Sequence, residues 1–184
     1  MHRLFIVLIS LLATESFAAE VTNLYQSPVP VVSQSEQERQ QLAPQVLRQV
    51  ILKVVGDRSA IDVTDLSPVL GQANKLVQQF QYERINEIDE DLTQPDRLAL
   101  LLKFNEPSLN KSLTNLGLPI WSKTRPDVLV WIALDDGQNR TVIGSESSEY
   151  NIPVLLEQAA ELRGLPIFLP VMDLQDHAQV KFAD

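Results

Sequence analysis

The spacing of hydrophobic residues along this chain predicts both strands and helices. Every residue from 128 to 134 is apolar, which predicts a strand buried on both faces rather than the alternating strand of a half-exposed sheet. The residues that follow, Asp135, Asp136 and Gly137, are typical of a turn. We therefore expect residues 128–134 to form the central strand of a core.

Residues 42–55 instead carry apolar side chains at helical spacing. Ser35 and Glu38 precede them in the pattern of a capping box, so a helix is predicted to begin there. Pro44 should bend the first part of this helix or mark its true start. The helix should end at Gly56 in the left-handed conformation, with Asp57 ordering the exit loop through local hydrogen bonds. A functional carboxylate at Asp57 is the alternative.

Shorter elements are predicted around this helix. Residues 21–32 include Pro28 and Pro30, which remove ladder donors and favour an edge strand. Residues 80–88 and 98–104 should form a β-hairpin, whose acidic loop is either a solvated tip or a site that attracts cations. Cap and stop residues predict two further helices in this half, at residues 65–76 and 105–116.

The last third of the chain predicts a strand, a helix and a second strand. Residues 141–143 should pair with the central strand as a short hairpin partner. Residues 165–172 form a second apolar run, and the intervening helix suggests a parallel pair with a right-handed crossover. That helix should begin at Asn151 and turn four residues inward: Val154, Leu155, Ala159 and Leu162.

Together these elements predict an α+β protein. Residues 19–120 should form an antiparallel sheet with helices, and residues 121–184 a small α/β unit of β-β-α-β order that is possibly incomplete. Trp121 lies in the connector and should close the seam between the units, with a ligand platform as the alternative. A parallel strand buried on both faces needs helices on both sides. The second unit therefore lacks one covering element, which either the first unit or a segment beyond Asp184 would supply.

The N-terminal segment has the pattern of a secretory signal peptide. A basic start, Met1 to Arg3, precedes an apolar stretch, and Ser16 and Ala18 are small residues at the positions that a signal peptidase requires. The apolar stretch is ~10 residues long against the ~20 that cross a bilayer, so a retained anchor is the weaker alternative. Residues 1–18 are therefore predicted to be removed, leaving a periplasmic protein with no membrane span.

Composition narrows the possible partners and chemistry. The chain has 15 basic and 24 acidic residues, a net charge of −9, which disfavours nucleic acid and anionic membranes as partners. It has no cysteine, which excludes disulfides, thiolate metal sites and cysteine catalysis. The familiar nucleophile-elbow, phosphate-loop, dinucleotide and zinc-protease motifs are missing. The expected partner is another periplasmic or envelope protein.

One candidate site remains. If the two apolar runs are parallel, their carboxyl ends share the edge where open α/β sheets place ligands. Carboxylates and one imidazole at that edge suit a divalent cation, the only cofactor we consider. The alternative is that these residues form a turn, a helix cap and a solvated surface. The candidate ligands are Asp135, Asp136, Asp173, Asp176 and His177.

Four blocks of the chain resemble the DUF2066 family of exported Gram-negative proteins, which has no established function. The blocks are Val54-Val-Gly-Asp57, Leu118-Pro-Ile-Trp121, residues 125–137 and residues 163–176. The resemblance implies a periplasmic or envelope location and assigns no catalytic residues. Members of that family continue beyond the position of Asp184, which implies that this chain is a fragment or a shortened form.

Two functions are therefore considered. The first is a non-enzymatic envelope protein that presents a binding or assembly surface. The second is a divalent-cation-binding protein with hydrolytic activity at the C-terminal strand edge.

Overall fold

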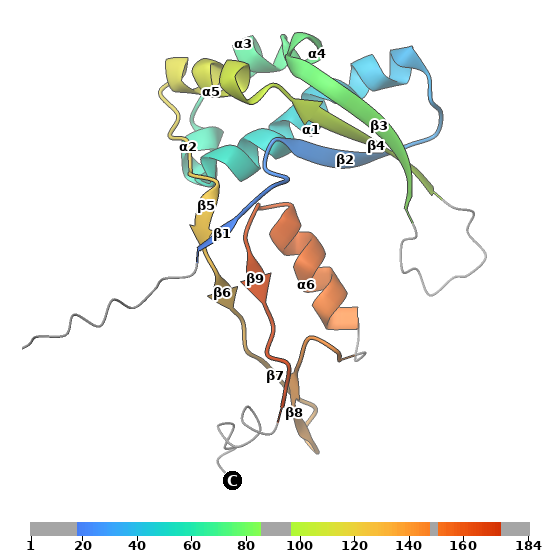
Figure 1. Ribbon diagram of the computed structural model, residues 1–184, viewed down its shortest axis with the longest axis vertical. Coiled ribbons are helices and arrows are strands. Elements are labelled where there is room, and N and C mark those ends of the chain that lie inside the picture. Colours follow the sequence, from blue (N-terminus) through green and yellow to red (C-terminus); the bar gives the residue numbers. More distant parts are fainter. Residues whose placement is uncertain (1–17, 86–96, 148–150, 174–184) are drawn as a thin grey trace, which may run out of the picture.

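A computed structural model describes residues 18–85, 97–147 and 151–173. Its largest sheet is antiparallel and three-stranded, in the order β2 (Gln26–Val31), β4 (Arg97–Phe104) and β3 (Val77–Ile85). The sheet combines with helices into an α+β fold, as the sequence predicts (Figure 1). Strands β3 and β4 form the predicted hairpin, and β2 is the predicted edge strand. The acidic loop of the hairpin lies outside the described residues.

Helix α1 (Glu36–Val55) begins at the predicted cap and ends at the predicted stop. The Ser35 hydroxyl accepts from the N–H of Glu38 at 3.2 Å, whereas the Glu38 carboxylate accepts from Val32 and Ser33 rather than from Ser35. Gly56 takes the left-handed conformation, with φ of 71°. Asp57 then caps the next helix by accepting from the N–H of Ala60, so the predicted local role of this carboxylate is confirmed.

The helix continues through Pro44. A proline has no N–H, so the carbonyl of Gln40, four residues earlier, loses its helical donor. The side-chain amide of Asn74 donates to this carbonyl at 3.1 Å. A contact from a distant part of the chain thus replaces the missing bond inside the helix.

The core lies between α1 and the inward face of the sheet. Side chains at helical spacing on α1 meet side chains at alternate positions of β4, and both sets are fully buried. The described residues of this part also form four short helices: α2 (Arg58–Asp62), α3 (Ser67–Leu70), α4 (Ala73–Leu76) and α5 (Glu106–Asn115). The fully buried residues of the core include Val46, Leu47, Val50, Ile51, Val54, Leu100, Leu102, Phe104, Leu109 and Leu113.

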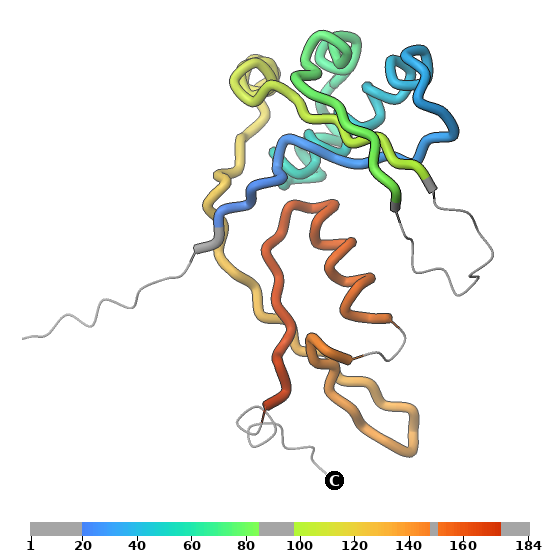
Figure 2. Tube along the Cα trace, turned by 45° about the vertical axis from the view of Figure 1, so that its right-hand side comes forward, coloured from blue at the N-terminus to red at the C-terminus, as the bar shows by residue number. Residues whose placement is uncertain are grey.

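The described residues of the C-terminal part form short strands and one helix. Strand β5 (Thr124–Pro126) pairs with β1 (Ala18–Glu20), and β6 (Val128–Leu129) runs parallel to β9 (Ile167–Phe168). Strand β7 (Ile132–Asp135) forms a hairpin with β8 (Arg140–Ile143), and α6 (Ile152–Glu161) precedes β9. The predicted parallel pair and hairpin partner are therefore confirmed. Figures 1 and 2 show α6 on the opposite side of the three-stranded sheet from α3, α4 and α5.

Two expectations for this part are wrong. The apolar run 128–134 is not one buried strand: it divides into β6 and β7, and Val128, Leu129 and Trp131 are exposed. The reason is that the parallel sheet has two strands and lacks, among the described residues, the second covering layer that such a sheet requires.

Helix α6 is also turned differently from the prediction. Pro153 and Ala160 are buried and Leu156 is half-buried, whereas three of the residues expected to face inward, Leu155, Ala159 and Leu162, are exposed. Both sets recur at helical spacing, so the pattern alone does not select the buried face. No helix among the described residues is long and apolar enough to span a membrane.

Candidate functional site

The two parts of the molecule meet at a buried arginine. Arg125, in β5, has no exposed surface. Its guanidinium donates to the carbonyls of Ser122 (3.0 Å), Lys53 (2.7 Å) and Gly164. Lys53 lies in the last turn of α1, and Gly164 follows α6. Arg125 therefore binds the carboxyl ends of two helices, where the helix dipole favours a positive charge.

Close packing surrounds this arginine. Its guanidinium carbon lies 4.0 Å from the ring centroid of Trp121, a cation–π contact. The N–H of Trp121 donates to the carbonyl of Val54 at 2.8 Å. A Cβ on Gly56 would lie 2.5 Å from the Trp121 ring, and a Cβ on Gly164 would lie 2.6 Å from Arg125. Trp121 thus packs at the seam between the two parts.

A second buried cation lies nearby. Lys53 is only 1% exposed, and its ammonium donates to the carbonyl of Gln26 at 3.0 Å. Burial lowers the pKa of Lys53, and the charge of Glu161 partly opposes this shift. A hollow of about 320 Å³ lies beside it, between the β1–β2 connection and α6, with Glu20, Glu157 and Glu161 in its lining. The hollow brings together acidic side chains and one lysine.

The exposed surface of the C-terminal part is unusually apolar. Leu129 is 56% exposed and Phe168 is 52% exposed. These two residues are partners in the β6–β9 register, so they lie side by side on one face of the sheet. Leu155 and Leu162 are exposed on the outer face of α6. We call the following set the C-terminal apolar residues: Val128, Leu129, Trp131, Leu155, Leu162, Phe168 and Val171.

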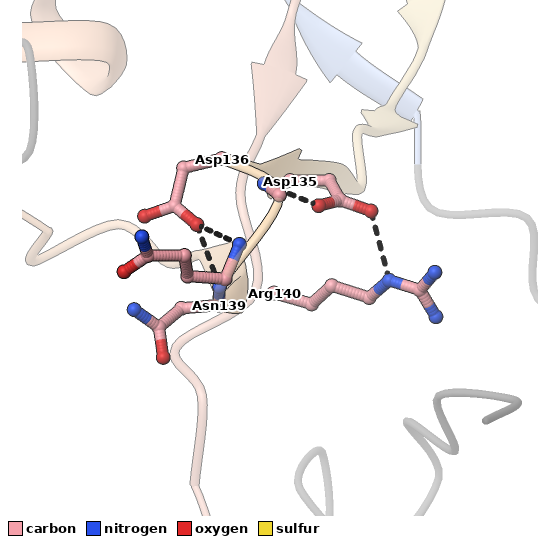
Figure 3. Close-up of polar contacts among 6 residues, drawn as sticks. Asp135, Asp136, Asn139 and Arg140 are labelled. Carbon is pink, nitrogen blue, oxygen red and sulfur yellow. Dashed lines mark hydrogen bonds and ion pairs between the residues drawn. The ribbon is translucent and has the colours of Figure 1, made fainter.

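The predicted metal ligands Asp135 and Asp136 lie in the β7–β8 turn (Figure 3). Asp135 accepts from the N–H of Gly137 at 2.9 Å and pairs with Arg140 at 2.9 Å. Asp136 accepts from the N–H of Gln138 (2.8 Å) and of Asn139 (2.6 Å). The backbone hydrogen bond from Gly137 and the bond from Arg140 lower the pKa of Asp135. The backbone bonds from Asn139 and Gln138 lower the pKa of Asp136.

The structure describes only one of the remaining predicted ligands, Asp173. Asp173 is exposed, while Asp176 and His177 lie outside the described residues. Within residues 18–85, 97–147 and 151–173, no group of three or more histidines and carboxylates is placed to hold a metal ion. The contacts of Asp135 and Asp136 are those of a hairpin turn. The metal site as a whole stays a prediction.

This geometry describes an α+β protein with a helix-covered antiparallel sheet, followed by a smaller part with exposed apolar strands. The chain belongs to the family described as Domain of unknown function (DUF8605), whose model matches residues 18–122. No curated protein and no solved structure matches the chain.

The resemblance to DUF2066 is therefore wrong, because the family that matches is a different one. The two longest blocks behind the resemblance, residues 125–137 and 163–176, lie beyond the matched residues. Each consists mainly of an apolar run followed by acidic residues. Strand packing imposes that pattern on unrelated chains, so it does not identify a family.

The sequence interpretation did not single out Arg125 or Lys53. A usable signal existed for Lys53, because it is the one charged residue in the apolar stretch from Val50 to Val55. Arg125 gave a weaker signal, since its partners are backbone carbonyls, which no sequence pattern identifies.

Proposed function

We propose that this chain is an exported binding or assembly module of the cell envelope, without catalytic activity of its own. It would act in the periplasm and present its C-terminal apolar residues to a partner protein. Export rests on the signal-peptide pattern of residues 1–18, which lie outside the described residues except for Ala18. The absence of familiar catalytic motifs from the sequence supports a binding role.

The exposure of the C-terminal apolar residues is the observation that carries this proposal. Soluble monomers seldom expose large apolar groups close together, and where they do, the surface commonly binds another molecule. Here a phenylalanine, a tryptophan and several aliphatic side chains of one small region are about half exposed or more. Aromatic and aliphatic anchors of this kind dominate the energetics of protein interfaces.

Site-specific photo-crosslinking tests the binding role. A photoreactive amino acid is placed at Leu155 or Phe168, both exposed C-terminal apolar residues, and at the exposed Gln81 of β3 as control. We expect discrete crosslinked products in envelope preparations from the two C-terminal positions and none from Gln81. Equal labelling at all three positions, or no product from any, would contradict the proposal.

Fractionation tests the location separately. The full chain is produced in a Gram-negative host, and the periplasmic fraction is analysed by mass spectrometry. We expect a product in that fraction whose first residue is Ala19. Retention of residues 1–18 in a cytoplasmic product would contradict export without bearing on the binding surface.

A further inference from the structure

One side of strand β6 has no hydrogen-bonding partner in the described chain. The N–H of Val128 donates to the carbonyl of Pro166 at 2.9 Å, and that of Val130 to the carbonyl of Phe168 at 2.8 Å. Alternate residues of a parallel strand direct their backbone groups to opposite sides. The N–H and C=O of Leu129 therefore point away from β9, and no described backbone group bonds to them.

The three-stranded sheet protects its edges. Strand β2 carries Pro28 and Pro30, and β3 carries Gln79, Gln81 and Glu83. Prolines and charged side chains are the usual means by which proteins prevent further strands from adding to an edge. Val128 and Leu129 of β6 and the two residues after them are neither prolines nor charged, whereas Pro126 and Asp127 directly precede the strand. The apolar stretch from Val128 to Trp131 thus offers an edge to which an extended segment of another chain can pair.

The charge around β6 limits which kind of strand could add to this edge. The exposed Asp127 directly precedes β6, and the chain has a net charge of −9. Repulsion between like charges disfavours a second copy of this chain and anionic lipid at this edge. A strand with basic residues beside an apolar centre is complementary both to the side chains of the edge and to the acidic flank.

We infer that β6 binds an extended, apolar segment of a partner protein, flanked by basic residues, which adds to the sheet as a third strand beside Leu129. This inference rests on the proposed binding function and specifies the partner and its mode of binding. The apolar side chains of the added strand would lie beside Leu129 and Phe168, which are already neighbours on one face. Its backbone would pair with the outward N–H and C=O of Leu129.

The probe is a fluorescently labelled synthetic peptide of alternating valine and threonine with lysines at both ends. The mature chain, residues 19–184, is titrated into it, and binding is followed by fluorescence anisotropy. Leu129→Pro removes the outward N–H but neither of the two N–H groups that donate to β9. Leu129→Ala is the matched control, since it shortens the side chain and keeps the N–H. We expect Leu129→Pro to weaken binding about tenfold or more, and Leu129→Ala clearly less.

Two further arms keep the test decisive if Leu129→Pro perturbs the fold. A peptide methylated at alternate backbone nitrogens cannot pair as a strand and should not bind the unmodified protein. Asp127→Lys should weaken the lysine-flanked peptide and favour the same peptide with glutamate flanks. Amide hydrogen exchange at Leu129 should slow when the lysine-flanked peptide binds.

Equal losses in Leu129→Pro and Leu129→Ala, undiminished binding of the methylated peptide, or no binding of the parent peptide would overturn strand addition. Binding to phosphatidylglycerol vesicles in its place would overturn it in favour of a lipid surface. Crosslinking at Leu155 and Phe168 would still support the binding function in the first three cases. The failures of the two proposals are therefore distinguishable.

Discussion

The two parts of this molecule differ in the burial of their apolar residues. In the N-terminal part, Leu47, Leu100 and Phe104 have no exposed surface, and both edges of the sheet carry prolines or polar side chains. In the C-terminal part, Leu129 and Phe168 are more than half exposed, and no described strand pairs with the outer edge of β6. The first part closes its core from its own elements, whereas the second exposes surface of the kind that interfaces bury.

The junction shows that the two parts are nevertheless held together by specific contacts. Arg125 bonds to the carbonyl of Lys53 in α1 and to that of Gly164 after α6. A buried charge is tolerated only when its hydrogen-bonding groups are satisfied. The C-terminal part is thus placed by backbone acceptors at two helix ends, and its exposed surface is held in a defined position relative to the N-terminal core.

The strongest test of this contrast compares two phenylalanines. Phe104→Ala should lower the free energy of unfolding by about 3–5 kcal/mol, because it removes a fully buried ring and leaves a cavity. Phe168→Ala should cost less than about 1 kcal/mol, because half of that side chain is already in water. Urea unfolding followed by circular dichroism measures both. Equal losses would show that Phe168 belongs to a closed core and that the contrast is wrong.

The junction gives the next largest effect. Arg125→Leu should destabilise the protein by about 3 kcal/mol, because several buried carbonyls lose their donor. Arg125→Lys should recover only part of this, since an ammonium lacks the planar fork of the guanidinium. Arg163→Leu, an exposed arginine near the same end of α6, is the matched control and should change stability by no more than about 0.5 kcal/mol.

The same variants show whether the junction couples the two parts. Thermal unfolding is followed by the fluorescence of the two tryptophans, Trp121 at the junction and Trp131 in the C-terminal part, and by circular dichroism. We expect the two signals to coincide in the unmodified protein and to separate in Arg125→Leu. Coincident transitions in both proteins would show that Arg125 stabilises the fold without coupling its parts.

A third test uses two glycines with similar positive φ values. Gly56 and Gly137 have φ values of 71° and 84°, and a left-handed alanine costs about 1–2 kcal/mol at either position. A Cβ at Gly56 would also displace the ring of Trp121, whereas one at Gly137 meets nothing within 4 Å. We expect Gly56→Ala to lower the melting temperature clearly more than Gly137→Ala. Equal shifts would mean that Trp121 moves aside without cost.

Local chemistry made the N-terminal part predictable. Ser35 predicted the start of α1 and Gly56 its end, because cap and stop residues act on backbone groups within one turn. Pro28 and Pro30 placed β2 at the sheet edge for a similar reason. The continuation of α1 through Pro44 was not predictable in this way. The carbonyl of Gln40, which Pro44 leaves without a helical donor, accepts instead from Asn74, which is distant in the sequence.

The C-terminal part was predicted in its connections but not in its burial. The spacing of apolar residues predicted the parallel pair and the hairpin. An apolar run indicates only that its burial is favourable, however, and the sequence does not show which element covers it. Leu155 and Leu162 show this most clearly, since α6 has two apolar stripes and the fold buries the other one. The turn at Asp135 and Asp136 was the alternative to the metal site, and its contacts are local ones that turn residues commonly make.

The smallest expected effect is a sensitivity to acid. The test compares one carboxylate from each part, Glu38 and Asp136. The pKa of Glu38 is lowered by the Ser33 hydroxyl and the N–H of Val32, and that of Asp136 by the N–H groups of Asn139 and Gln138. A carboxyl group whose pKa is lower in the folded than in the unfolded state stabilises the fold at pH values above its unfolded pKa, which is near 3.9 for aspartate. This stabilisation is lost as the pH falls through the folded-state pKa. We therefore expect the amide NMR signals of Gln138 and Asn139 to titrate together with a midpoint below about 3.9.

Asp136→Asn keeps an acceptor oxygen and removes the titrating charge, so the same amide signals should become independent of pH in that variant. The signals of Val32 and Ser33 should still titrate with Glu38, which provides an internal control in the N-terminal part. Addition of magnesium or manganese chloride at neutral pH should leave the Gln138 and Asn139 signals unchanged if the carboxylate serves the turn. A selective shift or broadening at these amides would show that the turn also binds a cation, and would restore the metal site at this end of the molecule.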